Sequence, residues 1–341
     1  MHRRLRLMNG LWVDRYVHKN RGEEVCMTVT NSQKVKSITV FVNTSSGLKS
    51  KEEAPAKLQE LLAPMGLHVD VREVQKGVDV TELAACAVRE GCPVVVAGGG
   101  DGTVRAVASA VAYTETALGI LPLGTLNHLA RDLGIPIDLE GAAKVVVNGT
   151  PVAVDAAQVN GRLFVNNSVI GLYPWYRAIR DREEELGRPK PLAILKGILT
   201  VFRANPYLRV RLIVKGQQVE RKTPYILVAN NRHGMDGYNL GRRQSLREGR
   251  IWVYMMKPQT RWGLLRLVLS LLFGQFRGER DFEAVAAEEA TVMTRGKTLN
   301  VSLDGEIVTL KTPLEFRILA GALKVIVPKD SPHAIKYAEE T

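Results

Sequence analysis

Hydrophobic and polar positions follow two alternating periods in the first half of the chain. Short continuous apolar runs predict buried strands, and apolar residues spaced three and four positions apart predict helices. The predicted strands are 38–42, 68–74, 93–97 and 118–121, and the predicted helices are 54–62, 82–90, 103–112 and 127–133. Because strand and helix alternate, we expect a parallel sheet covered by helices, an α/β domain over residues 37–155.

The pattern changes after residue 152. Short alternating runs are joined by pairs that favour hairpin turns, which are Asn160-Gly161, Lys215-Gly216 and Asp304-Gly305. This predicts a second, antiparallel β-rich domain over 156–311, interrupted by two apolar helical stretches at 192–202 and 262–276. Residues 312–328 can return to the first domain.

The two ends of the chain carry weaker patterns. Residues 1–36 are polar and basic, so we expect a loosely ordered extension with room for one short helix. Residues 329–341 are expected to form a tail. No apolar run follows the basic N-terminus as a secretory signal would require, and the stretch 262–276 is shorter than the roughly 20 residues of a membrane span.

The charge balance points to an anionic partner. Lys and Arg number 47 against 35 Asp and Glu, a net charge of +12, which suits nucleotide phosphate, an acidic membrane or nucleic acid. Nucleic acid is disfavoured because the basic residues are dispersed and no RNA- or DNA-binding motif is present. The six His residues show no zinc spacing, so a metal is expected to bind oxygen, and the three Cys residues are expected to be free thiols.

A glycine-rich loop lies between a predicted strand and a predicted helix. Gly98 to Thr103 read GGGDGT, and glycines at a helix N-terminus allow backbone N–H groups to approach a phosphate closely. The loop is neither a Walker A motif nor GxGxxG. Asp101 would repel a phosphate unless a cation lay between them, so it implies Mg²⁺ or a role in proton transfer. The alternative is a tight turn in which Asp101 caps the helix.

A second loop, Pro122 to Asn127, follows the next strand and precedes the next helix. Loops at the carboxyl ends of neighbouring parallel strands share one crevice, where ligands bind in open α/β sheets. By itself a Gly-Thr pair before a helix is ordinary capping. The two loops together predict a single ligand crevice.

Four stretches resemble the diacylglycerol kinase catalytic family. They are GGGDGT, PLGTLNHLARDLGIP, the segment from Asp155 to Gly171 that contains FVNN, and SLDGE at 302–306, and the resemblance covers about 37–328. It implies an α/β nucleotide-binding domain like that of NAD kinases, a β-sandwich second domain, ATP and Mg²⁺ as cofactors, and a lipid acceptor near the cleft. NAD kinases share GGDGT, but the PLGTxN loop followed by ARxLGIP favours the lipid kinases.

The resemblance also implies roles for particular residues. Glu306 would be the proton acceptor, with Asp304 as its neighbour, and Asp101 would support the catalytic Mg²⁺. The alternative for Asp304-Gly305 is a type I′ hairpin turn. Nucleotide contacts would fall on Asn43, Ser46, Gly47, Gly99, Gly100, Asp101, Gly102, Thr103, Gly124, Thr125 and Asn127.

The chain departs from the family pattern at several positions. Thr44 stands where relatives carry Pro, which makes the first loop less rigid, and Glu73 stands near a nucleotide-contacting Thr. A second, structural Mg²⁺ would fall on Ser245, Glu248 and Arg250. The family has an Asp-Gly segment there, and the Glu248 side chain with its basic neighbours puts that metal in doubt.

The sequence therefore predicts an ATP-dependent lipid kinase that phosphorylates a diacylglycerol-like or sphingoid hydroxyl. The alternatives are a kinase of a soluble acceptor such as NAD and a non-catalytic, nucleotide-sensing membrane adaptor. We expect a cytoplasmic protein that visits the inner face of the membrane transiently, with a homodimer left open. Its docking face would include Trp262, Leu265, Leu269, Leu272 and Phe276 with Arg261, Arg266 and Arg277, unless this stretch is a core helix.

Overall fold

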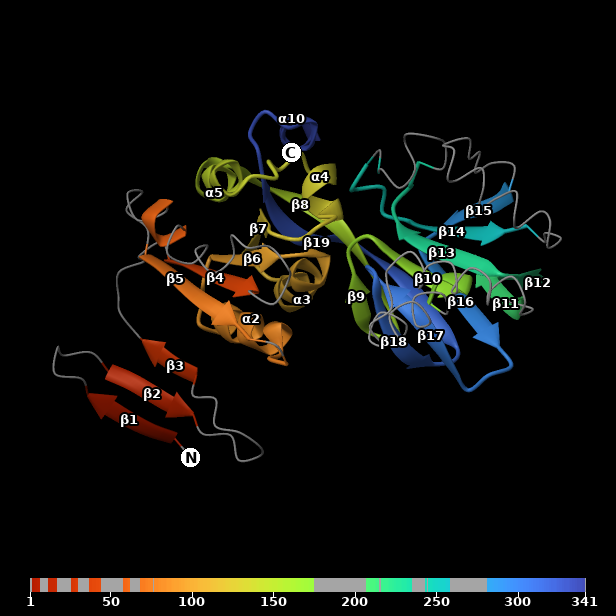
Figure 1. The fold of residues 1–341 in the computed structure, drawn as a ribbon, viewed down its shortest axis with the longest axis horizontal. Helices are drawn as coiled ribbons and strands as arrows, with labels where there is room; N and C mark the ends of the chain where they lie inside the picture. The colour runs from red at the N-terminus through yellow and green to blue at the C-terminus, as the bar shows by residue number, and fades with distance from the viewer. Residues whose placement is uncertain are drawn as a thin grey trace, which may run out of the picture.

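A parallel sheet forms the centre of the N-terminal half in the computed structural model (Figure 1). The structure describes residues 2–6, 12–16, 26–29, 37–43, 58–61, 68–75, 77–174, 207–214, 216–234, 243, 245–257 and 281–340. The sheet order is β5-β4-β6-β7-β19, with all four neighbouring pairs parallel. The strands are β4 (Ser37–Asn43), β5 (His68–Val74), β6 (Val94–Gly99), β7 (Ala117–Pro122) and β19 (Leu314–Val327).

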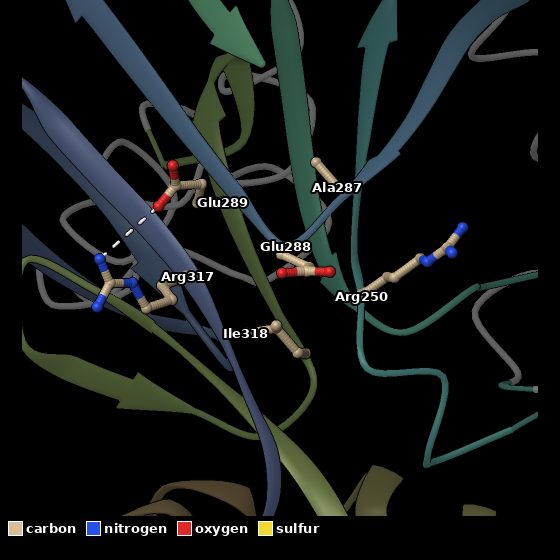
Figure 2. A pocket seen from close by; sticks show the side chains of 6 residues that line it. All are labelled: Arg250, Ala287, Glu288, Glu289, Arg317 and Ile318. Atoms are coloured by element: carbon tan, nitrogen blue, oxygen red, sulfur yellow. Dashed lines mark ion pairs between the residues drawn. The ribbon is translucent and has the colours of Figure 1, made fainter. Parts of the chain in front are cut away.

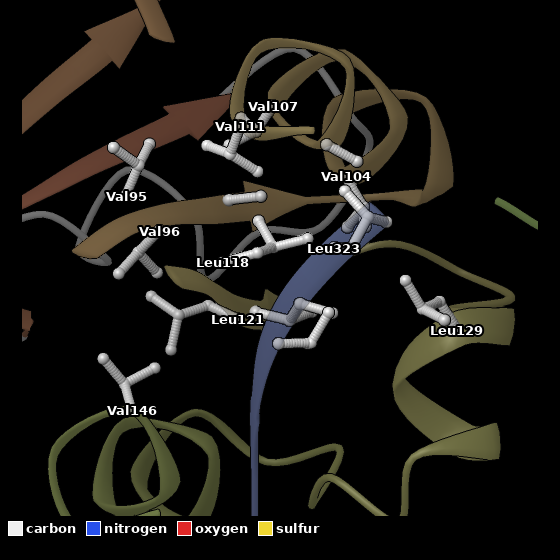
Figure 3. Packing of buried hydrophobic residues seen from close by; sticks show 14 of the residues in the cluster. Val95, Val96, Val104, Val107, Val111, Leu118, Leu121, Leu129, Val146 and Leu323 are labelled. Carbon is white, nitrogen blue, oxygen red and sulfur yellow. The ribbon is translucent and has the colours of Figure 1, made fainter. Parts of the chain in front are cut away.

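Helices cover both faces of this sheet. Figure 3 shows Val104, Val107 and Val111 of α3 on one side of the strands and Val146 of α5 on the other. Both helices are amphipathic, and their buried residues recur at helical spacing. Each buried valine contributes about 1.5–3 kcal/mol to folding. The helices are α2 (Val80–Arg89), α3 (Asp101–Val111), α4 (His128–Asp132) and α5 (Leu139–Asn148).

The second half is a sandwich of antiparallel strands. One sheet has the order β15-β14-β13-β10-β17-β18, and the other continues from β19 through β16 and β11 to β12. A buried apolar cluster separate from the first domain's core fills the space between them. The strands are β10 (Asn167–Gly171), β11 (Leu208–Val214), β12 (Gln217–Thr223), β13 (Tyr225–Asn230), β14 (Ile251–Met256), β15 (Phe282–Ala287), β16 (Glu289–Thr294), β17 (Thr298–Leu303) and β18 (Glu306–Lys311). The predicted fold class, an α/β domain followed by a β-sandwich, is confirmed.

Two long strands connect the domains. β8 (Thr150–Val159) pairs antiparallel with β19 along most of its length, and the register shifts between Leu319 and Leu323. β9 (Arg162–Phe164) extends this ribbon. The last residues of β19 lie beside β7 in the α/β sheet, while its first residues pair with β16 in the sandwich. Figure 1 shows the ribbon running from one domain to the other.

The ends of the chain and one helix differ from the sequence analysis. The segment expected to be a loose extension contains an antiparallel sheet of β1 (His2–Arg6), β2 (Trp12–Tyr16) and β3 (Cys26–Val29). The expected tail contains α10 (Pro332–Glu340), and α5, capped by Asp138, went unpredicted. Cys92 is a buried free thiol but Cys86 is in a disulfide, so the expectation of three free thiols is wrong.

Candidate active site

The glycine loop connects β6 to α3 as predicted. Gly100 is the N-cap residue of α3 and contributes no side-chain hydrogen bond, so the first N–H groups of the helix are available to an anion. A Cβ on Gly99 would lie 2.5 Å from Oγ1 of Thr103, which explains the glycine there. Thr103 is buried, and its Oγ1 accepts a hydrogen bond of 3.2 Å from Nδ2 of Asn43 at the end of β4.

The second loop packs directly on the first. The N–H of Leu123 donates to the carbonyl of Gly99 at 3.0 Å, and a Cβ on Gly124 would overlap the Cα of Gly100. A side chain at position 124 would therefore prevent this approach of the backbones. The two strand-end loops therefore form a single edge, as their positions in the sequence predict.

Asn127 shapes the second loop from inside. It is buried with a left-handed backbone (φ 50°), which Asn tolerates better than most residues. Its Oδ1 accepts from the N–H of Gly124 at 3.0 Å, and its Nδ2 donates to the carbonyls of Gly124 and Pro122 at 2.8 and 3.2 Å. These bonds tie its side chain to its own loop, whereas Thr125 is exposed on the surface of the loop.

Asp101 joins the two loops. Its Oδ1 accepts a 2.8 Å hydrogen bond from the N–H of His128, the first residue of α4. The carboxylate thus caps the neighbouring helix rather than its own, which the sequence could not distinguish. Mg²⁺ in kinases is held by one or two carboxylates together with substrate phosphates, and the Asp101 carboxylate between the two glycine-containing loops fits that pattern. Among the described residues no three His, Cys, Asp or Glu side chains gather into a metal site.

Glu306 comes to this edge from the other domain. Asp304 and Gly305, with φ of 47° and 91°, form the two-residue turn between β17 and β18, consistent with a type I′ hairpin. Glu306 begins β18, and its Oε1 lies where a Cβ on Gly102 would be. Its Oε2 forms an ion pair with Nη2 of Arg105 on α3. The glycine loop and the SLDGE segment, about 200 residues apart in sequence, therefore meet.

Asp304 has a different environment from Glu306. Its Oδ2 accepts from the N–H of Val165 at 2.8 Å, and its Oδ1 accepts from the N–H groups of Asn166 and Asn167 at 2.8 and 3.0 Å. Burial raises the pKa of the carboxyl, while these three donors and the charge of Arg105 act in the opposite direction. The Asp304 carboxylate organises the FVNN turn beside the hairpin.

A buried polar network behind the site was not predicted. The guanidinium of Arg243 donates from Nε to Oδ2 of Asp132 at 2.7 Å and from Nη1 to the carbonyl of Val165 at 2.6 Å. Nε2 of His233 lies 2.8 Å from Oδ1 of Asn166. Asp132 lies in the PLGTLN motif region and Asn166 in FVNN, but nothing in the sequence connects Arg243 or His233 to either of them.

The residues of the expected second metal site are engaged by protein donors. Oε2 of Glu248 accepts from Nε1 of Trp252 at 2.8 Å and from the N–H of Arg232 at 3.3 Å, and Oγ of Ser245 accepts from the N–H of Arg247. Both side chains thus already accept hydrogen bonds from the protein, and the structural Mg²⁺ on Ser245, Glu248 and Arg250 stays a prediction. Ser46, Gly47, Thr44 and the predicted docking stretch 262–276 lie outside the described residues.

A separate pocket lies at the β15–β16 turn (Figure 2). Glu288 is at its centre with Arg250 and Arg317 on either side, and Arg317 pairs with Glu289 at 3.7 Å. Apart from Arg250 it contains none of the predicted site residues, so we do not assign it to the site.

In the described part of the chain, no helix is long and apolar enough to cross a membrane.

Comparison with known proteins agrees with this geometry. The family model for the diacylglycerol kinase catalytic domain matches residues 37–159, and the model for the YegS C-terminal NAD kinase beta sandwich-like domain matches 182–327. The chain is 31% identical over 272 residues to the "Probable lipid kinase YegS-like" of Pseudomonas aeruginosa PAO1, covering 78% of this chain and 87% of that protein. It is 26% identical over 307 residues to the "Diacylglycerol kinase" of Bacillus subtilis 168, covering 87% and 98%.

The fold is also found in a solved structure. The crystal structure of a diacylglycerol kinase from Bacillus anthracis str. Sterne superposes with a TM-score of 0.65 at 24% identity, covering 87% of this chain and 98% of that one. At this identity the likeness shows the fold alone. Fold and family matches thus define a protein of a two-domain kinase family with the NAD kinase-like architecture. The chain belongs to the diacylglycerol kinase catalytic-domain family, whose relatives include lipid kinases.

Proposed function

We propose that this chain is an ATP-dependent lipid kinase that transfers the γ-phosphate of ATP to the hydroxyl of a diacylglycerol-like or sphingoid lipid. The observation that carries the proposal is the meeting of three segments, in which Gly124 contacts Gly100 and the Glu306 carboxylate lies against Gly102. An edge of glycine N–H groups is thereby placed beside a carboxylate that can accept a proton. Phosphoryl transfer requires donors that hold the phosphates and a carboxylate near the attacking hydroxyl.

Each residue of the edge has a distinct task in this proposal. The N–H groups of Gly100 to Thr103 bind the phosphates, and Thr103 and Asn43 brace the loop through their hydrogen bond. Asp101 would hold Mg²⁺, which when bound neutralises charge on the triphosphate. Glu306, whose side chain is 54% exposed, accepts the proton of the attacking hydroxyl. Asp304 keeps the hairpin in place through its bonds to residues 165–167.

The acceptor determines where the protein works. A long-chain lipid stays in the bilayer because each buried CH₂ contributes about 0.8 kcal/mol, so we propose transient association with the inner face of the membrane in the cytoplasm. Disulfides such as the one at Cys86 form mainly in oxidising compartments, so this bond argues against a cytoplasmic location. Cell fractionation therefore tests the location directly, and recovery outside the cytoplasm would refute it.

The activity is tested by incubating the protein with γ-labelled ATP, Mg²⁺ and a total lipid extract. We expect a labelled lipid, and we expect Glu306→Gln and Asp101→Asn to lower turnover by about 100-fold or more. Glu283→Gln is the matched control because Glu283 pairs with Arg221 on the distant sandwich surface, so its turnover should be unchanged. Label on a soluble acceptor without lipid would contradict the proposal, and so would full activity of the Glu306 variant.

A further inference from the structure

Arg105 occupies a position that the proposed function does not yet use. It lies one helical turn after Asp101 on α3, and side chains in a helix point back toward its N-terminus. Its Nη2 pairs with Oε2 of Glu306. Its side chain is only 16% exposed, and its Nε is buried without a hydrogen-bond partner. The guanidinium is thus held at the glycine loop with part of its donor capacity unused.

The ion pair conflicts with the task proposed for Glu306. A charge-assisted hydrogen bond from Arg occupies one of the acceptor sites of the carboxylate and fixes its orientation, which makes the group a poorer acceptor for the proton of a hydroxyl. The other oxygen lies against Gly102, so the whole carboxylate is docked on the start of α3. Departure from Arg105 would free the Glu306 carboxylate to turn toward the attacking hydroxyl.

The reaction itself supplies a competitor for Arg105. The planar guanidinium matches phosphate oxygens as well as it matches a carboxylate. Phosphates bound to the N–H groups around Gly102 would arrive beside the Glu306 carboxylate and repel it. The unpartnered Nε provides a donor that a phosphate oxygen could satisfy, and the exposed side of Glu306 leaves room for it to move.

We propose that Arg105 is a positioning residue that exchanges partners. Without nucleotide it holds Glu306 on Gly102, and with a triphosphate bound it turns to the terminal phosphate and releases Glu306 to accept the proton of the acceptor. Asp304 does not take part, because three backbone N–H groups hold its oxygens in place. This inference rests on the proposed kinase function and adds the residue that couples nucleotide binding to the base.

Equilibrium binding distinguishes this exchange from a structural role. We would titrate wild type, Arg105→Met and Glu306→Gln with β,γ-imido-ATP and with ADP, in Mg²⁺, by calorimetry. Arg105→Met should bind the imido triphosphate about tenfold or more weakly, with ADP changed by less than about threefold. Glu306→Gln should bind the triphosphate several-fold more tightly, because Arg105 no longer has to leave a charged partner. Opposite effects of two partner substitutions are not expected from a bond that only stabilises the fold.

Controls separate the possible failures. Arg89→Met removes a comparable pair with Glu82 on the exposed surface of α2 and should leave both affinities unchanged, and Arg105→Lys should restore part of the discrimination. Equal loss of both nucleotides in Arg105→Met, or weaker triphosphate binding by Glu306→Gln, would overturn the exchange. If Arg105→Met does not fold, the Glu306→Gln and Arg105→Lys titrations still decide. If the wild type labels lipid but the variants bind the triphosphate and ADP with unchanged relative affinity, only this inference is refuted. If the wild type binds neither nucleotide, the proposed kinase function is refuted as well.

Discussion

Acids two residues apart in the SLDGE segment have opposite surroundings. Asp304 is held by three backbone N–H groups, whereas Glu306 extends to the glycine loop and meets Arg105. The turn produces the difference, because the backbone reverses between them and directs each side chain to another segment. The sequence places both acids near the site, but only the tertiary contacts show that backbone donors hold Asp304 while Glu306 reaches the glycine loop.

His233 gives a prediction at the same scale. Burial, with a smaller effect from the charge of Arg243, lowers the pKa of its imidazole from 6.5 to about 3. The folded state therefore favours neutral His233, so its stabilisation is complete above pH 6.5 and is lost as the pH falls toward 3. Each pH unit in that window costs up to about 1.4 kcal/mol. Urea unfolding at pH 7 and pH 5 should show a smaller loss of stability in His233→Gln than in wild type. An equal loss in both proteins would contradict the assignment.

At the scale of elements, the site depends on two strand-to-helix loops that touch through glycines. β6 and β7 are neighbours in the sheet, so their carboxyl ends deliver Gly100 and Gly124 to the same edge. The hydrogen bonds of Asn127 then bring the second loop back on itself. The backbones of the two loops are therefore tied together, and the side chains of the proposed exchange, Arg105 and Glu306, come from α3 and β18.

Substituting the two glycines should have unequal effects. A methyl on Gly124 would overlap the Cα of Gly100, whereas a methyl on Gly100 would lie 3.4 Å from the Cα of Gly124, an ordinary contact. We expect Gly124→Ala to lower the free energy of unfolding by about 1–3 kcal/mol. Gly100→Ala, its matched control, should lower it by less than about 1 kcal/mol. Urea unfolding measures both, and equal losses would show that the loops can move apart.

At the scale of the whole molecule, the domains share strands rather than a flexible linker. β8 and β19 belong to the sheets of both. Asp155 stabilises the register shift between these two strands, because its Oδ1 accepts from the N–H of Gly321 at 2.8 Å and its Oδ2 accepts from the N–H of Gly249 at 2.7 Å. Unfolding of one domain would remove backbone hydrogen-bond partners from the strands of the other domain, so we expect the two domains to unfold together.

Asp155→Asn tests this coupling. The substitution turns an amide NH₂ toward one of the two N–H donors, and it should cost about 1.5–3 kcal/mol. Hydrogen exchange in rising urea should show segments 94–99 and 225–230 losing protection at the same urea concentration. In the variant this concentration should be lower by the same amount for both segments. Asp138→Asn is the control because Asn caps a helix as well as Asp does. Separate transitions for the two segments would refute the shared-strand account.

Much of this architecture could be predicted from local patterns. The apolar runs and helical spacings located β4 to β7 and α2 to α4 within a few residues. This succeeds because the period of buried positions depends only on residues that are neighbours in the sequence. The glycines also predicted the meeting of the loops. Helix α5 could have been predicted, since Asp138 caps an amphipathic stretch. The N-terminal strands carried no clear period and were not predicted.

The sequence by itself determined the two domain types, the loops at the strand ends and the acids that could serve them, since each is specified by neighbours along the chain. Only the tertiary structure decided that Asp101 caps α4, that Asp304 binds backbone N–H groups, and that Arg105 reaches Glu306. These contacts join residues that can be up to 201 positions apart. Their geometry depends on how the shared strands β8 and β19 set one domain against the other, and no local pattern records that packing.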